Sequence, residues 1–329
     1  MPSRALGATG LVVTPIGLGL AALGRPAYIT LGRQEDLGRE RSVEAMERRC
    51  HEVLDAAYQA GVRYLDAARS YGLAEMFLAS WLERRHLAPE AITVGSKWGY
   101  TYTGGWRLAA EVHEVKDHSL ATLRRQLAET RELLGTWLDL YQIHSATLES
   151  GVLEDTGVLA ELVRLREEGL TVGLTASGPR QAEVVERALE AEVDGVNPFG
   201  VVQATWNLLE PSVGLALAAA HECGWGVIAK EVLANGRLTP HGNGPARATL
   251  EAVASRHAVT VTPDAVALAA ALANPWVDLV LSGAVTVGQL HTNLTACGLK
   301  LTAEDLEELG TLAEPAERYW AERGELPWA

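Results

Sequence analysis

The sequence predicts an α/β fold in which eight parallel strands, each followed by a helix, close into a barrel. Two observations lead to this prediction. Short β-prone segments alternate with amphipathic helical segments along the chain, and no linker-like stretch divides its 329 residues. Such alternation implies parallel pairing with right-handed crossovers, and eight units of this length close most naturally into a (β/α)8, or TIM, barrel. We therefore expect residues 1–329 to form a single domain.

The expected elements follow in a simple order. A hairpin over residues 4–13 has a Gly-containing turn and should cap the barrel as part of residues 1–14. After the last strand, a helix over 302–313 begins the C-terminal segment 302–329. Its aromatic residues Tyr319, Trp320 and Trp328 could close over the site or pack on the barrel exterior, and we favour the exterior. The expected barrel strands are 15–20, 62–66, 92–97, 138–144, 170–175, 200–205, 225–230 and 279–282.

One motif in the first strand has two interpretations. Gly17, Gly19 and Ala22 match the G-x-G-x-x-G/A dinucleotide-binding fingerprint. That fingerprint needs a tight turn leading straight into a helix, whereas here a Gly-rich polar loop over 24–42 precedes the helix start at Ser42. A glycine-lined barrel strand is therefore the better interpretation.

Two long irregular stretches each follow the carboxyl end of a predicted strand. They cover residues 98–116 and 231–263, and the second is least regular up to residue 248. Barrel enzymes keep their sites on this face, so both stretches should overhang a site. The run VHEVKDHS is expected to be a solvated approach to the helix that begins near Ser119.

Composition argues against a membrane protein, a nonspecific nucleic-acid-binding protein and a zinc protein. No apolar run approaches the roughly 20 residues of a membrane span, and MPSRALGATG lacks the apolar core of a signal peptide. The 42 acidic residues outnumber the 28 basic ones, which argues against nonspecific binding to nucleic acids or anionic membranes. Cys50, Cys223 and Cys297 lack a CxxC zinc pattern and should be reduced, mostly packed thiols. We expect a cytoplasmic protein without a metal site.

Four polar side chains lie at or just past predicted strand ends, which converge in a barrel: Asp66, Tyr71, Lys97 and His144. A buried Lys costs stability unless it is paired, so Lys97 should pair with Asp66. An ammonium held near Tyr71 should lower the pKa of its phenol from about 10. Tyr71 could then donate a proton to a carbonyl oxygen that His144 orients. Taken singly, each residue could equally be structural.

Several segments resemble signature segments of the aldo-keto reductase superfamily: RALGATGLVVTPIGLGL, YLDAARSYGLAE, GSKWG and LDLYQIHSA. The resemblance covers nearly the whole chain and implies a catalytic tetrad of Asp66, Tyr71, Lys97 and His144, with Tyr71 as proton donor. It also implies a nicotinamide cofactor extended across the barrel mouth, NADP(H) first and NAD(H) as the alternative, acting on a small carbonyl or alcohol substrate. Self-association is left open.

The resemblance also implies a set of cofactor contacts. Gln203 matches the family position that holds the nicotinamide carboxamide, whereas Val285 stands where many NADPH-dependent relatives carry Arg or Lys. The alternative for the last segment is an ordinary turn, with Thr286 as N-cap and Asn293 on a solvated face. The candidate contacts are Thr175, Ser177, Gln203, Lys230, Leu233, Gly236, Leu238, Ser282, Gly283, Thr286, Gln289 and Asn293.

Lys230 replaces an aromatic residue that stacks on the nicotinamide in many relatives. Either its stem covers the ring while its ammonium contacts a phosphate or an anionic substrate group, or it pairs with Glu231 or another carboxylate at the rim and props the loop. Trp98, Tyr102 and Trp106 are candidates for the substrate-pocket wall.

Two other functions stay open. A Lys at a barrel strand end can form a Schiff base, as in class I aldolases, and Lys97 or Lys230 could do so. A protein of this kind could also bind a nicotinamide cofactor without turnover and report redox state to a partner.

Overall fold

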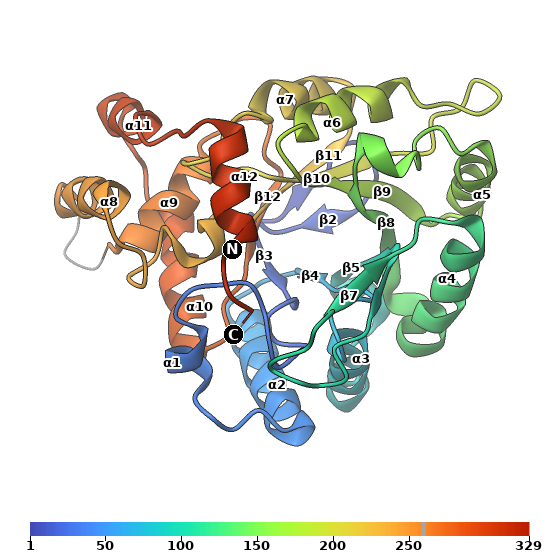
Figure 1. Ribbon diagram of the computed structural model, residues 1–329, viewed down its shortest axis with the longest axis horizontal. Helices are drawn as coiled ribbons and strands as arrows, with labels where there is room; N and C mark the ends of the chain where they lie inside the picture. Colours follow the sequence, from blue (N-terminus) through green and yellow to red (C-terminus); the bar gives the residue numbers. More distant parts are fainter. Residues whose placement is uncertain (258–260, 329) are drawn as a thin grey trace.

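The computed structural model describes residues 1–257 and 261–328, and its centre is a closed barrel of parallel strands (Figure 1). The strands follow one another in chain order, and the last pairs with the first through Val280 and Ile16. The predicted (β/α)8 fold is therefore confirmed. The barrel strands are β3 (Ile16–Gly19), β4 (Tyr64–Asp66), β5 (Thr93–Trp98), β8 (Leu138–Ala146), β9 (Thr171–Ala176), β10 (Val201–Thr205), β11 (Gly226–Lys230) and β12 (Leu279–Ser282).

Helices surround this barrel in Figure 1 and bury apolar side chains against it. The helices between or after the barrel strands are α2 (Val43–Gln59), α3 (Ala74–Arg85), α4 (Leu120–Leu134), α5 (Thr156–Glu167), α6 (Gln181–Glu190), α7 (Gly214–Glu222), α9 (Pro263–Leu272) and α10 (Val287–Leu294). Additional helices are α1 (Arg33–Leu37), α8 (Pro245–Ser255), α11 (Ala303–Gly310) and α12 (Ala316–Gly324). Short 3-10 turns are η1 (Pro89–Ala91), η2 (Gly135–Trp137), η3 (Leu148–Ser150), η4 (Ala234–Gly236) and η5 (Thr295–Gly298).

The helix starts that the sequence predicts are capped by their own side chains. Ser42 and Ser119 each accept a hydrogen bond from the backbone N–H three residues on, and Thr302 forms a reciprocal pair with Asp305. Such caps satisfy backbone donors that the first turn of a helix leaves without a partner. These polar residues therefore mark the boundaries reliably.

The amino end of the barrel is closed by the predicted hairpin of β1 (Arg4–Ala5) and β2 (Val12–Val13). Leu6 and Val13 are fully buried there. Gly7 has a φ of 52° and passes so close to Gly226 that a side chain at residue 7 would overlap its backbone. The hairpin thus seals this end with apolar contacts.

A second hairpin lies over the carboxyl ends of the strands, in front of the barrel in Figure 1. It consists of β6 (Tyr100–Tyr102) and β7 (Glu114–Lys116). The expectation that VHEVKDHS is only a solvated approach to α4 is therefore wrong, because three of its residues form a strand. The pairing partner lies 12 or more residues earlier, so the charged run alone carries no signal of it.

The C-terminal tail also lies over the barrel mouth, which corrects its expected exterior position. Tyr319 of α12 is buried, and its hydroxyl accepts a hydrogen bond from Asn207 (2.9 Å). Trp328 pairs with Ile29 as an antiparallel bridge and stacks on His113, with 4.2 Å between ring centroids. These partners are far away in sequence, so no local pattern indicates them. Ala329 and residues 258–260 of the predicted loop 231–263 lie outside the described residues.

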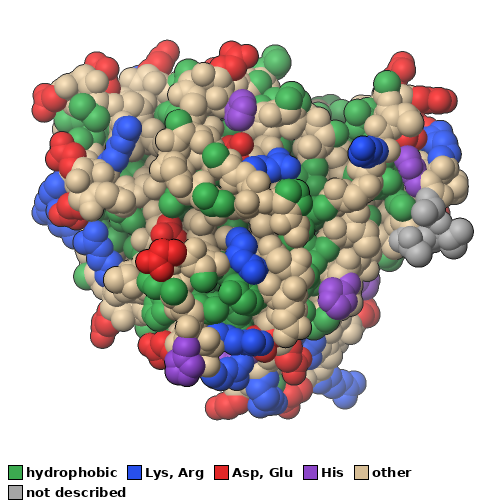
Figure 2. All heavy atoms as spheres, turned by 180° about the vertical axis from the view of Figure 1, so that it is seen from behind, with side chains coloured by type: hydrophobic (Ala, Val, Ile, Leu, Met, Phe, Trp, Pro, Cys, Tyr) green, Lys and Arg blue, Asp and Glu red, His purple; other side chains and the backbone are tan. Residues whose placement is uncertain are grey.

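Surface features add two observations. None of the helices in residues 1–257 and 261–328 is long and apolar enough to cross a membrane. Figure 2 shows the face opposite to that in Figure 1, where Lys and Arg side chains are interspersed with Asp and Glu. Cys50 is buried, but Cys223 and Cys297 are exposed, so the expectation of mostly packed thiols is wrong for two of three.

Candidate active site

A cavity of about 630 Å³ opens at the carboxyl ends of the barrel strands. Its wall combines strand ends with the loops that follow β3, β11 and β12, and the tail residues Arg323 and Trp328. It extends from Tyr71 and His144 to Gln289 and Asn293 on α10. The cavity therefore connects Tyr71 and His144 with α10.

Asp66 and Lys97 form the predicted ion pair at the base of this cavity. Asp66 ends β4 and Lys97 lies in β5, with exposed fractions of 1% and 0%. Lys97 also donates to the carbonyl of Ala67 (2.9 Å). Asp66 accepts further hydrogen bonds from Tyr64 (3.2 Å) and Gln203 (3.0 Å). Burial lowers the pKa of Lys97, and the Asp66 carboxylate opposes that effect.

The Tyr71 ring lies next to the Lys97 ammonium of this pair. The Lys97 ammonium is 4.9 Å from the centre of the Tyr71 ring. Two glycines allow the chain to pack closely around Tyr71. Gly72 has a φ of 62°, and a side chain at Gly24 would overlap the carbonyl of Tyr71. The loop after β3 can therefore pass close to the turn that follows Tyr71.

The pKa of Tyr71 differs from our expectation. Burial and the Asp66 carboxylate raise the pKa of its phenol well above 10, and Arg25 opposes them only partly. The expectation of a lowered pKa is therefore wrong, because burial and the Asp66 carboxylate outweigh the positive charges nearby. Tyr71 is thus fully protonated at neutral pH.

His144 lies beside Tyr71, with 5.3 Å between ring centroids. Burial, Lys97 and Arg25 lower the pKa of its imidazole well below 6.5, so the ring is neutral. Ser70 lies within hydrogen-bond distance of Nδ1 (3.3 Å). When Ser70 donates its hydroxyl proton to Nδ1, Nε2 carries the ring proton and can donate to a ligand.

Most of the candidate cofactor contacts line the cavity, but two do not. Leu238 is fully buried beneath the loop. Thr286 caps α10 by accepting from the N–H of Gln289 (3.2 Å), as the structural alternative predicted. Asn293 is buried and bonded to Ser282 rather than solvated. The lining members are Thr175, Ser177, Gln203, Lys230, Leu233, Gly236, Ser282, Gly283, Gln289 and Asn293.

The three aromatic residues expected in the substrate pocket lie outside the described cavity wall. Trp98 is fully buried against His118, with 5.7 Å between ring centroids. Trp106 donates to the carbonyl of Arg41 (2.8 Å), and Tyr102 belongs to the hairpin β6–β7. Because side chains alternate between the two faces of a strand, Lys97 facing inward directs Trp98 outward. The aromatic wall is instead supplied by Tyr28 and Trp328.

Lys230 does not pair with Glu231, which was one of the two alternatives for it. Its ammonium donates to Ser177 (3.0 Å) and Thr205 (2.7 Å), and burial lowers its pKa to about 8. Glu231 instead accepts from Arg323 of the tail (2.8 Å). Burial would raise the pKa of Glu231, but the charges of Arg323 and Lys230 outweigh it and lower the value to about 2. The tail therefore holds the loop that follows β11.

Several wall residues were missed by sequence reasoning. Arg25, Tyr28 and Arg33 belong to the loop after β3, which brings three large side chains to the cavity. Arg25 pairs with Glu114 of β7 (2.9 Å), and its guanidinium lies 5.2 Å from the centre of the Tyr71 ring. Loop 24–42 follows the carboxyl end of a predicted strand, and this position could have predicted that its side chains reach the cavity. The same reasoning placed the other two loops at the site.

The fold and the site together define a closed parallel barrel with a cluster of buried charged side chains at its carboxyl face. Residues 15–314 match the sequence pattern of the Aldo/keto reductase family. The chain therefore belongs to the aldo/keto reductase family, whose members use nicotinamide cofactors to interconvert carbonyl compounds and alcohols.

Individual relatives agree with this assignment. The chain is 27% identical to aldo-keto reductase str7 of Strobilurus tenacellus, covering 96% of this chain and 93% of that protein. It is 26% identical to the uncharacterized oxidoreductase YqkF of Bacillus subtilis, covering 94% and 95%. The holo form of aldo-keto reductase AKR11C1 from Bacillus halodurans has a similar fold, with a TM-score of 0.71, 24% identity and coverage of 96% and 97%.

Proposed function

We propose that this protein transfers a hydride between NADP(H) or NAD(H) and a small aldehyde or ketone, with Tyr71 as the proton donor in reduction. The observation that carries the proposal is the contact between the Tyr71 ring and the ammonium of Lys97, which is paired with the buried Asp66, beside a neutral His144. We expect it to work in the cytoplasm, since its thiols are unpaired in the described structure.

The cavity wall fits a polar dinucleotide. Arg33, Asn235 and Asp264 line it and have buried polar atoms without a partner among the described residues. Buried polar atoms are normally hydrogen-bonded, so these groups are suited to a ligand with its own donors and acceptors. Gln203, Ser282 and Asn293 would hold the cofactor, which supplies the hydride when bound.

Each residue of the centre has a distinct role in the proposal. The substrate oxygen gains negative charge during reduction, and His144 donates a hydrogen bond to it from Nε2. Tyr71 then transfers its proton, because an alkoxide is a much stronger base than a phenolate. The Lys97 ammonium favours the phenolate that remains, and Asp66 holds that ammonium in place.

The test is a titration of the purified protein with NADPH and NADH, followed by a screen of aldehydes, ketones and aldoses in both directions. We expect saturable binding of at least one reduced cofactor and its carbonyl-dependent oxidation. Cofactor binding without turnover of any substrate would favour a redox sensor.

A Schiff-base lyase is less compatible with this geometry. Lys97 is bonded to Asp66 and Ala67 and is absent from the described cavity wall, whereas Lys230 lines it. Borohydride trapping with a carbonyl substrate should leave Lys230 unmodified. A trapped adduct at Lys230 would support the lyase instead.

A further inference from the structure

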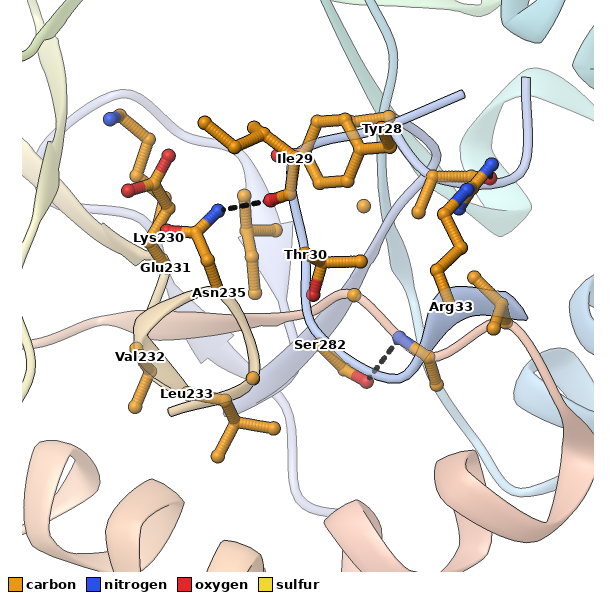
Figure 3. A pocket seen from close by; sticks show the side chains of 18 of the residues that line it. Tyr28, Ile29, Thr30, Arg33, Lys230, Glu231, Val232, Leu233, Asn235 and Ser282 are labelled. Atoms are coloured by element: carbon orange, nitrogen blue, oxygen red, sulfur yellow. Dashed lines mark hydrogen bonds between the residues drawn. The ribbon is translucent and has the colours of Figure 1, made fainter. Parts of the chain in front are cut away.

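Arg33 is a fully enclosed cation in the wall of the cavity. It begins α1 in the loop that follows β3, has an exposed fraction of 1%, and lines the groove with Ser282 and Asn235 (Figure 3). Its Nη2 donates to the carbonyls of Ala22 (2.7 Å) and Arg25 (2.6 Å). Its Nε and Nη1 have no partner among the described residues.

The guanidinium also lacks a counter-ion. No carboxylate in residues 1–257 and 261–328 lies within ion-pair distance of it, whereas Arg25 and Arg237 in the same protein have such partners. Burial, Arg41 and Arg25 lower the pKa of Arg33 to about 9, so it is still charged at neutral pH. Buried arginines are normally paired, because an isolated buried charge loses its hydration without compensation.

Hydrogen bonds connect the loop that contains Arg33 to the loop that follows β11. Asn235 donates to the carbonyl of Ile29 (2.8 Å), and the N–H of Leu31 donates to the carbonyl of Asn235 (2.9 Å). These bonds join the loop after β3 to the loop after β11 above the groove. In Figure 3, Tyr28, Ile29 and Thr30 lie between Lys230 on one side and Arg33 on the other.

We propose that Arg33 binds the diphosphate of the nicotinamide dinucleotide and receives its missing counter-ion from it. This inference rests on the proposed function. Arg33 donates to the carbonyl of Arg25, whose guanidinium lies over the Tyr71 ring, and it lines the same cavity as Tyr71 and Gln289 of α10. In an extended dinucleotide the diphosphate separates the nicotinamide at Tyr71 from the adenosine at α10. The three free N–H donors on Nε and Nη1 suit phosphate oxygens.

The test compares dissociation constants for NADP+, NAD+ and ADP-ribose, measured by isothermal titration calorimetry on the full-length protein. Arg33→Gln keeps an amide donor for the carbonyls of Ala22 and Arg25 but removes the charge. We expect it to weaken all three ligands by a similar factor, on the order of tenfold to a hundredfold. The loss should shrink at high salt, and Arg33→Lys should recover part of the affinity.

Arg41→Gln is the matched control. Arg41 belongs to the same loop and donates to the carbonyls of Pro26 and Gly38, but it does not line the described cavity. It should lower the thermal midpoint without changing any dissociation constant by more than about twofold.

Other results would overturn the assignment. Unchanged affinities in Arg33→Gln with a lowered thermal midpoint would leave Arg33 a loop-holding role only. A loss confined to NADP+ would place the contact at the 2′-phosphate rather than the diphosphate. If the wild-type protein binds none of the three ligands, the proposed function itself fails, independently of Arg33.

Discussion

Two buried aspartates occupy opposite ends of the barrel and have very different partners. Asp278 precedes β12 at the amino end and accepts from the backbone N–H groups of Gly7 (3.1 Å) and Val227 (2.8 Å). Asp66 ends β4 at the carboxyl end and accepts from the side chains of Lys97, Tyr64 and Gln203. A carboxylate bonded to backbone fixes the chain, whereas one bonded to ionisable side chains sets their charge. We therefore expect the first to serve stability and, under the proposed function, the second to serve the chemistry.

The largest effect should follow from Tyr71→Phe. It removes the proposed proton donor, so we expect carbonyl reduction to fall by about 10²–10⁴-fold. Cofactor affinity should stay within a few-fold, because the phenol is not a cofactor contact. Steady-state rates with the best substrate of the screen, together with a cofactor titration, measure both quantities. Wild-type turnover in this variant would refute the mechanism.

Lys97→Met should abolish most activity and also destabilise the protein. It leaves Asp66 buried with only Tyr64 and Gln203 as donors, and breaking a buried pair costs about 3–5 kcal/mol of unfolding free energy. Asp66→Asn should lose somewhat less activity. Urea denaturation and steady-state kinetics check these expectations. A fully active Lys97→Met variant would show that the Asp66–Lys97 pair, like Asp278, serves stability only.

Val285→Arg should shift cofactor selectivity toward NADPH. Val285 lines the cavity without supplying a charge, and a charge-assisted contact to phosphate is worth about 1.5–3 kcal/mol. We expect the native preference for NADPH to be weak and the variant's preference to be stronger by that amount. The ratio of dissociation constants for NADPH and NADH measures the change. A strong native preference that this substitution leaves unchanged would show that the 2′-phosphate is held elsewhere.

Lys230→Met should weaken dinucleotide binding by about tenfold, or ~1.4 kcal/mol, with the loss shrinking at high salt. Because the pKa of Lys230 is about 8, its charge and the affinity it supports should decline as pH rises through 8. Lys230→Tyr should recover part of the stacking but not the salt dependence. Unchanged affinity with lowered thermal stability would indicate that Lys230 only supports the loop.

The lowered pKa of Lys230 affects folding stability in the opposite direction from cofactor affinity. The folded-state pKa of about 8 lies below the unfolded value of about 10.4, so between these values the unfolded state binds more protons. The contribution of Lys230 to stability therefore rises with pH in this window. Denaturation of the wild type and Lys230→Met at about pH 8 and about pH 10, close to the folded and unfolded pKa values of Lys230, should show this increment only in the wild type.

Asp278→Asn should have the smallest effect on activity. It weakens the acceptor for Gly7 and Val227, so we expect a loss of about 1–3 kcal/mol of unfolding free energy. Turnover per folded molecule should equal that of the wild type, because the substitution lies at the opposite end of the barrel. A selective loss of turnover at unchanged stability would break the comparison with Asp66.

The sequence by itself determined the barrel strands, the helix starts marked by caps, and the buried Asp66–Lys97 pair. Strand and helix periods are local, and the caps at Ser42 and Ser119 act within one turn, so neighbouring residues suffice to predict them. The pairing of Asp66 with Lys97 followed from convergence of strand ends and from the cost of leaving a buried Lys unpaired.

Only the tertiary structure decided which segments cover the cavity and which charged side chains lie close to one another. Trp328 meets Ile29, Arg323 meets Glu231, and the carbonyls of Ala22 and Arg25 enclose Arg33, all through irregular segments without a period. The pKa of Tyr71 likewise rises because burial and Asp66 outweigh the positive charges nearby. Such balances depend on distances between residues far apart in the chain, and a linear pattern contains no record of those distances.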